Sequence, residues 1–335
     1  MRFLYVLILG ILAFTQCKNF GHKKDYGNLP QDSAQFMIWC DALAKDSNNS
    51  EVLFLRAGYY AKKHQYIRAL ADANKATIID TTKSDYFLLL GDICFAVNKT
   101  KIAALAYERA IVLDKENYAA FLKLGQLYYI VKEHPSSLRN YDEALKITSN
   151  CEECYFFKGL NYREMIRLEN HDELAIAMFQ KAISLNPNYY EAYIQLGELN
   201  ETKNTKLALE YFNAALRLQP KSIEALYHRG YHYQMINNFD SAGADYKRIL
   251  EINQTYLDAY FNVAFMNMKQ GKWETAIEGF KIVVKLNENN EGGWLNLGKC
   301  YENTRKIDKA KKAYFECLRI NKENSEAISR LRTLK

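Results

Sequence analysis

Proline and glycine are scarce in this chain. Only 4 prolines and 15 glycines occur among 335 residues. Because proline breaks helices and both residues mark tight turns, their scarcity favours long helices over a turn-rich β fold. An excess of one charge is also lacking, since 45 Lys and Arg stand against 39 Asp and Glu. No basic block typical of a nucleic-acid interface appears, so we expect no nucleic-acid partner.

Motifs of the common enzyme classes are absent from the sequence as well. It contains no nucleotide-binding glycine loop, no HExxH and no nucleophile elbow. His228 and His232 are four residues apart, which suits two zinc ligands on one helical face, but the sequence names no third ligand. We therefore expect a protein without enzyme activity, metal or cofactor.

The amino terminus has the composition of a secretion signal. Arg2 precedes an uncharged apolar run over residues 3–15, which is too short to span a membrane but suits a signal peptide. Cys17 follows, and the arrangement resembles the lipobox of bacterial lipoproteins, although Phe14 and Gln16 depart from the residues that this family prefers. The resemblance implies a signal peptide over 1–17 and a lipid on Cys17. A plain secreted protein and an uncleaved anchor are the alternatives.

The next segment, 18–30, is polar and contains two glycines and a proline, so it is predicted to be a flexible tether.

A period close to 34 residues runs through the remainder. The middle of each predicted first helix carries a small residue, at Ala57, Gly91, Gly125, Gly159, Gly197, Gly230, Ala264 and Gly298. The second helices carry another small residue, at Ala69, Ala103, Ser137, Ala175, Ala208, Ala242, Ala276 and Ala310. Four residues later come Ala73, Tyr107, Tyr141, Phe179, Phe212, Tyr246, Phe280 and Tyr314. Because glycine inside a helix costs about 0.5–1 kcal/mol relative to alanine, its recurrence at one phase indicates a close approach between helices.

These phases resemble the tetratricopeptide repeat, a helix–turn–helix unit of 34 residues. The resemblance implies an all-α, right-handed superhelical solenoid. We expect an N-terminal capping helix over 31–49, eight repeats over 50–324 and a C-terminal capping helix over 325–335 that starts at Ser325. The fourth repeat has about four extra residues near 167–171, and the fifth is one residue short.

The resemblance also predicts where a partner binds. In the family, the first helices line the concave wall of the solenoid, and residues just off the core phases face the partner. Here these are Phe54, Phe95, Tyr129, Phe156, Tyr227, Tyr231, Phe261 and Phe265, interspersed with Asp85, Asp92, Glu191, Glu198, Glu201 and Asp258. Asn262 and Asn296 occupy a phase that certain relatives use to hold a peptide backbone. Aromatic side chains are typical interface anchors, so we predict a groove for a peptide or protein.

The cysteines leave several interpretations open. Cys151 and Cys154 form a C-x-x-C pair, which we read as a local disulfide or free thiols, as a pair with another function, or as metal ligands. Cys94 and Cys317 fall on core phases and are predicted to be buried.

We expect a lipid-anchored scaffold of the bacterial cell envelope, at the outer membrane or the periplasmic face, that binds a protein or peptide. An accessory subunit of an envelope enzyme with a redox-active C-x-x-C pair is one alternative. An intracellular adaptor is another.

Overall fold

The computed structural model describes residues 33–334, and within that range every regular element is a helix. The predicted all-α class is confirmed. The chain divides into two compact units, one ending at Pro187 and the other beginning at Asn188, and each is described by itself.

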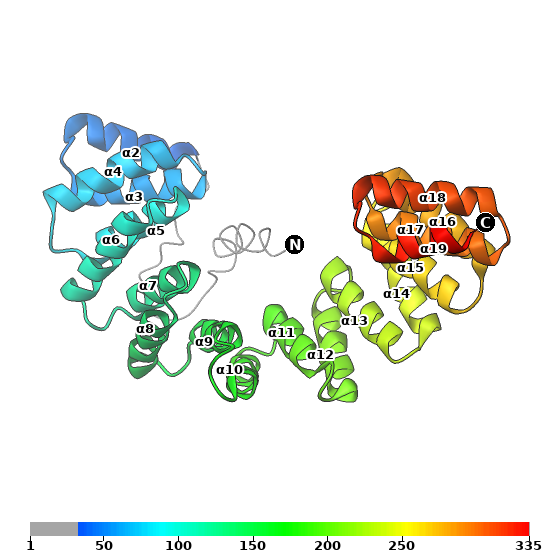
Figure 1. Cartoon of the computed structure of the whole chain (residues 1–335). Coiled ribbons are helices and arrows are strands. Elements are labelled where there is room, and N and C mark those ends of the chain that lie inside the picture. Colours follow the sequence, from blue (N-terminus) through cyan, green and yellow to red (C-terminus); the bar gives the residue numbers. More distant parts are fainter. Residues whose placement is uncertain (1–32, 335) are drawn as a thin grey trace. The chain divides into compact units, whose positions relative to one another are not determined.

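The helices of the first unit are α2 (Ser33–Lys45), α3 (Ser50–Lys62), α4 (Tyr66–Ile79), α5 (Ser84–Ala96), α6 (Thr100–Leu113), α7 (Tyr118–Ile130), α8 (His134–Ile147), α9 (Glu152–Glu164) and α10 (His171–Leu185) (Figure 1). The second unit contains α11 (Tyr190–Asn200), α12 (Thr205–Leu218), α13 (Ile223–Met235), α14 (Phe239–Ile252), α15 (Leu257–Lys269), α16 (Trp273–Leu286), α17 (Glu291–Asn303), α18 (Ile307–Ile320) and α19 (Ser325–Thr333).

Consecutive helices pair into repeats. In the first unit α3 packs on α4, α5 on α6, α7 on α8 and α9 on α10, and α2 contacts α3 at one end of the stack. The first helices α3, α5, α7 and α9 also contact one another in turn, so they form a continuous layer. The second unit pairs α11 with α12 through to α17 with α18, and α19 packs against α18. The side chains of the first-helix layer that reach its surface are called the first-helix face below.

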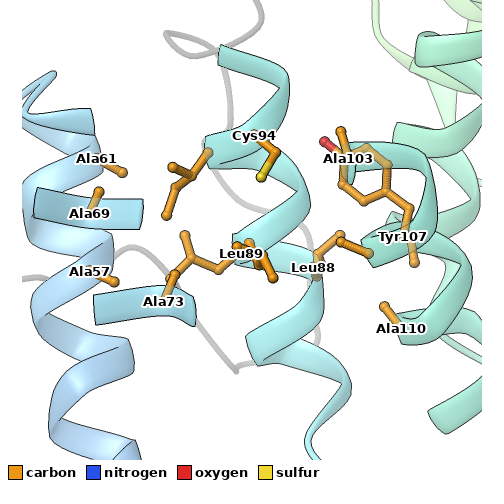
Figure 2. Packing of buried hydrophobic residues seen from close by; sticks show 14 of the residues in the cluster. Ala57, Ala61, Ala69, Ala73, Leu88, Leu89, Cys94, Ala103, Tyr107 and Ala110 are labelled. Carbon is orange, nitrogen blue, oxygen red and sulfur yellow. The ribbon is translucent and has the colours of Figure 1, made fainter. Parts of the chain in front are cut away.

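The core follows the predicted phases. The small residues of the second helices are fully buried from Ala69 to Ala310, and so are the large rings four residues later from Tyr141 to Tyr314. Figure 2 shows Leu88, Leu89 and Cys94 of α5 between the alanines of α3 and α4 and the ring of Tyr107 on α6. Each repeat thus buries its apolar surface against its own partner helix and the next repeat.

The glycines on the first helices make room for these rings. A β-carbon on Gly125 would lie 2.6 Å from the ring of Tyr141, and one on Gly298 would lie 2.5 Å from the ring of Tyr314. Real β-carbons do not approach that closely, so in these repeats the ring can lie across the first helix because a side chain is missing there.

In the seventh repeat the glycine that permits the close approach lies on the second helix instead of the first. Its first helix carries Ala264 at the glycine phase, and the second helix carries Gly279 immediately before Phe280. A β-carbon on Gly279 would lie 2.7 Å from that of Ala264. Here the second helix, rather than the first, lacks a side chain at the contact, and the two helices still approach closely.

The repeats end on asparagine and aspartate turns more often than on proline. The side-chain oxygens of Asp80, Asp114 and Asn253 accept a hydrogen bond from the backbone N–H two residues ahead at 2.9–3.0 Å. Such turns stop a helix without proline. The last helix is capped one residue earlier than predicted, because the Asn324 side chain rather than Ser325 accepts from the N–H of Ala327 at 2.8 Å.

The inserted residues of the fourth repeat lie between α9 and α10, where residues 165–170 separate the two helices. In the second repeat α5 and α6 are separated only by residues 97–99. The shortness of the fifth repeat is seen in α11, which has 11 residues, whereas α13 has 13.

Two glycines of the second unit allow a matched test of the close approach. We expect Gly298→Ala to lower the free energy of unfolding by about 1–3 kcal/mol, because its β-carbon overlaps the buried Tyr314 ring. Gly243 lies inside α14 with no atom within 4 Å of the added β-carbon, so Gly243→Ala is expected to stabilise by about 0.5–1 kcal/mol. Urea unfolding followed by circular dichroism measures both. Equal effects of the two variants would show that the ring does not set the glycine phase.

Candidate functional site

The first-helix face of the first unit carries three of the predicted aromatic side chains. Phe54 stacks on Tyr86 with ring centroids 4.8 Å apart, and Phe95 packs against the core while remaining partly exposed. Tyr129 is partly exposed, and its hydroxyl donates to Glu164 at 2.7 Å. These rings keep part of their surface accessible and are fixed by neighbours, as interface anchors require.

The prediction that Phe156 faces a partner is wrong. Only 5% of its surface is exposed, and its ring packs against Phe157 and Phe179 at 5.5 Å. The second helix α10 of the same repeat covers the position through Phe179, so the side chain belongs to the core and offers no surface to a partner.

A tyrosine hydroxyl of a second helix also reaches the first-helix face. The ring of Tyr107 crosses α5 beside Gly91, and its hydroxyl donates to Asp92 at 2.8 Å. Burial raises the pKa of the Asp92 carboxyl, an effect that nearby Lys123 and the Tyr107 hydrogen bond oppose. The carboxylate is therefore held at a desolvated position.

The second unit repeats this arrangement. The Tyr314 hydroxyl donates to Glu302 at 2.8 Å, and that of Tyr246 to Gln234 at 3.3 Å. In the seventh repeat the residue twelve positions before the ring is Met268, and the ring is Phe280. A buried hydroxyl needs an acceptor, and the first helix supplies one for Tyr246 and Tyr314. The hydroxyl of Tyr141 in the first unit, by contrast, makes no hydrogen bond of normal geometry.

The first-helix face of the second unit gathers the remaining predicted aromatics. Phe261 and Phe265 stack with centroids 6.3 Å apart, and Tyr227 lies 6.3 Å from Tyr256. Tyr231 is 37% exposed, and the other three predicted rings are half-buried.

Acidic side chains border these rings. Glu191, Glu224 and Asp258 are each the second residue of their helices α11, α13 and α15. Tyr190 connects two of the repeats, because its hydroxyl lies 2.6 Å from that of Ser222 and donates to Glu224 at 3.1 Å. Burial raises the pKa of the Glu191 carboxyl, and the negative charge of Glu224 raises it further.

The two predicted asparagines lie deeper than expected. Asn262 and Asn296 are 9% and 7% exposed. The Asn262 amide lies beside the hydroxyls of Tyr227 and Tyr246, and its Nδ2 has no hydrogen-bond partner of normal geometry. An unpaired buried donor is costly, so this amide is a position where a ligand acceptor would be stabilised.

The histidine pair does not form a metal site among the described residues, where no group of three potential ligands was found. His232 is buried, which lowers the pKa of its imidazole, and His228 lies 3.1 Å from Glu198.

The cysteine pair is joined as a disulfide at the start of α9, and both residues are buried. The Cys151 sulfur also accepts the N–H of Cys154 at 3.1 Å, so it caps the helix. Cys94 and Cys317 are buried as predicted, and burial raises the pKa of the Cys317 thiol to about 11.

A second surface was not predicted from the sequence. Exposed apolar side chains lie on the second helices α4 and α6, with Ile67 90% and both Leu105 and Val112 65% exposed. The same phases of α8 carry Arg139 and Lys146. The signal was available, because Leu105 and Val112 lie off the core phases. We call Leu105 and Val112, which lie two turns apart on α6, the outer apolar patch.

The predicted signal peptide, Cys17 and the tether lie outside the described residues. Within the described residues, no helix combines the length and hydrophobicity that membrane crossing requires.

Comparison with known proteins agrees with this architecture. Two family profiles, both described as tetratricopeptide repeat, match residues 152–189 and 292–324 and residues 173–223 and 204–256. A UDP-N-acetylglucosamine–peptide N-acetylglucosaminyltransferase of Giardia intestinalis is 24% identical over 81% of this chain. The human Tetratricopeptide repeat protein 6 is 25% identical over 86%. The chain spans only 18% of the first relative and 56% of the second.

Solved structures share the fold at low sequence identity. PilF of Pseudomonas aeruginosa aligns with a TM-score of 0.55 and 16% identity, over 67% of this chain and 97% of its own. The Cut9–Hcn1 hetero-tetramer of the APC/C aligns with a TM-score of 0.50 and 17% identity, over 87% of this chain and 57% of its own.

The half-buried carboxyl of Asp92 predicts a pH-dependent stability. Its pKa is raised in the folded state, so folding favours the protonated form. The contribution of this group is fully present below its unfolded pKa and is lost as the pH rises through the folded pKa. We expect Asp92→Asn to be at least as stable as the wild type at pH near 7 and to lose this advantage in acid. Urea midpoints across the acid range measure the difference. A constant difference between the two proteins would contradict the assignment.

Proposed function

Because this chain is built of tetratricopeptide repeats, which generally mediate protein–protein interactions, we propose that it is a non-catalytic scaffold whose first-helix face holds a peptide or protein partner. The observation that carries the proposal is the gathering of half-buried aromatic rings on that face in the second unit. Tyr227, Phe261 and Phe265 are fixed by ring contacts, and Tyr231 is 37% exposed. Rigid rings lose little conformational freedom on binding, which makes them effective anchors.

The proposal includes a lipid anchor in the bacterial cell envelope. It is supported by the apolar run over residues 3–15 and by Cys17, which follows that run as in a lipobox. Two or more acyl chains give stable attachment to a membrane, whereas one alone does not. The anchor would hold the repeats at a membrane surface, and the polar segment 18–30 would connect them to it.

The alternative of a redox-active accessory subunit has less support. Redox-active cysteines are accessible to their reaction partners. Cys151 is 4% exposed and Cys154 is fully buried, and the pair packs among Leu122, Tyr141 and Ala144. A disulfide in this position suits a staple at the start of α9 better than an exchange centre.

The partner face can be tested by capture from cells. We expect a tagged wild-type chain to crosslink a stoichiometric partner, and a Tyr231→Ala, Phe265→Ala double variant to lose most of it. Removal of a central aromatic anchor typically costs about 2 kcal/mol or more of binding free energy. Quantitative mass spectrometry of the captured proteins measures the loss.

Two controls locate the binding surface. Phe315→Ala removes an aromatic ring that is 61% exposed on the second helix α18, and it is expected to leave capture unchanged. A Leu105→Glu, Val112→Glu variant tests the outer apolar patch. A partner that survives loss of Tyr231 and Phe265 but disappears with the patch variant would overturn the first-helix assignment.

The anchor makes its own prediction. Cells fed a clickable palmitate analogue are expected to label the wild-type chain, and Cys17→Ser should abolish both the label and membrane retention. The matched variant Cys40→Ser alters a cysteine of α2 and should change neither. An unlabelled wild-type chain recovered in the soluble fraction would refute the anchor.

A further inference from the structure

Three acids of the second unit occupy equivalent positions in successive repeats. Glu191, Glu224 and Asp258 each lie six residues before the small residue of their own first helix, at Gly197, Gly230 and Ala264. Equivalent residues of stacked repeats follow one another along the same face. The three carboxyl groups therefore form a row that runs beside the aromatic rings.

The arginine and the lysine of these first helices contact other groups. Arg229 of α13 donates to Asp245 of α14 at 2.6 and 2.8 Å and to Asn213 of α12 at 2.7 Å, so its charge is compensated by the second helices. Lys269 lies at the last residue of α15 with its ammonium over the Phe265 ring, 5.3 Å from the centroid. These two cations are thus engaged by groups other than the three acids of the row.

Acids in the first turn of a helix also have a purely structural explanation, because they interact favourably with the helix dipole. That interaction would lower a carboxyl pKa, yet burial raises the pKa of Glu191. Burial raises the pKa values of Tyr227 and Tyr256, and the negative charge of Asp258 raises both further. The acids are therefore partly desolvated among tyrosines, where an added cation is worth more than at an open surface.

The buried amide of Asn262 provides an independent observation at the same place. It is 9% exposed, it lies beside the Tyr227 hydroxyl, and its Nδ2 makes no hydrogen bond of normal geometry. Its helix α15 is also the helix of Asp258 and Phe261. A peptide carbonyl laid along this face would supply the missing acceptor, as extended peptides do in other recognition modes.

We propose that the second unit recognises an extended cationic peptide, whose lysine or arginine side chains pair with Glu191, Glu224 and Asp258 while neighbouring residues pack on Tyr227 and Phe261. The inference rests on the proposed scaffold function and names the chemistry of its partner. Arginine and lysine stems also pack well on aromatic rings, so the acids and the rings serve the same ligand.

The test uses the full chain and two labelled peptides of equal length, one repeating Lys-Gly-Tyr and the other Glu-Gly-Tyr. Fluorescence anisotropy measures their binding. We expect the lysine peptide to bind, to weaken as salt is added, and to lose about tenfold or more in affinity to Asp258→Lys. The milder Asp258→Asn should give a smaller loss in the same direction, and circular dichroism checks that both variants fold.

Asp240→Lys is the matched control, because Asp240 is an exposed first-turn acid of the second helix α14 and the variant has the same net charge. It should leave binding unchanged. Equal losses in Asp258→Lys and Asp240→Lys, equal binding of both peptides, or no binding of the lysine peptide would each overturn the cationic assignment. These outcomes do not affect the proposed scaffold function if the Tyr231→Ala, Phe265→Ala variant still loses its captured partner. If that variant captures the partner as well as the wild type does, the first-helix face is refuted as the binding surface.

Discussion

The close approach of a second-helix ring to a first-helix backbone is the constraint on which the rest of each repeat depends. At Gly125 under Tyr141 and at Gly298 under Tyr314 the ring is buried where the facing β-carbon is missing, whereas the seventh repeat has Ala264 at that phase and buries Phe280 with Gly279 beside it. Glycine in a helix costs about 0.5–1 kcal/mol. Burial of a large apolar side chain returns about 1.5–3 kcal/mol, so the exchange favours folding in every repeat that uses it. The ring then fixes the distance between the two helices, and the remaining small residues follow from that distance.

The exceptions show that the volume of the contact is conserved, while the residue that supplies the space can change. In the seventh repeat the missing side chain belongs to Gly279 on the second helix, opposite Ala264. In the first repeat both sides are small, with Ala57 facing Ala73, and both are buried. Cores tolerate such compensations when total volume and pattern are preserved.

The sequence predicted the core well because its phases recur in eight repeats, and each repeat supports the interpretation of the others. Periodicity states which side of a helix faces its own partner, but it does not state how closely rings of the partner helix or of the preceding repeat cover the edge of that side. Phe156 and Asn262 were therefore assigned to the surface, and both are buried. The Arg229–Asp245 ion pair and the exchange at Gly279 also depend on contacts between helices and could not be read from phase alone. The aromatic positions Tyr227, Phe261 and Phe265 do retain accessible surface, as expected of positions just off the core phases of the first helices.

Recognition can vary in such a stack because stacking uses only part of each first helix. The small residue and the ring are fully used by packing, whereas the second residue of the helix stays half-buried at Glu191, Glu224 and Asp258. Three repeats place an acid there, and the only arginine of those first helices is held by Asp245. A structural role for the acids alone would not require that arginine to turn away, since a nearby cation would stabilise them. Because the arginine of α13 is engaged by Asp245 of its second helix, the acids and the rings lie together on the first-helix face, and this links the packing of the second unit to the chemistry proposed for its partner.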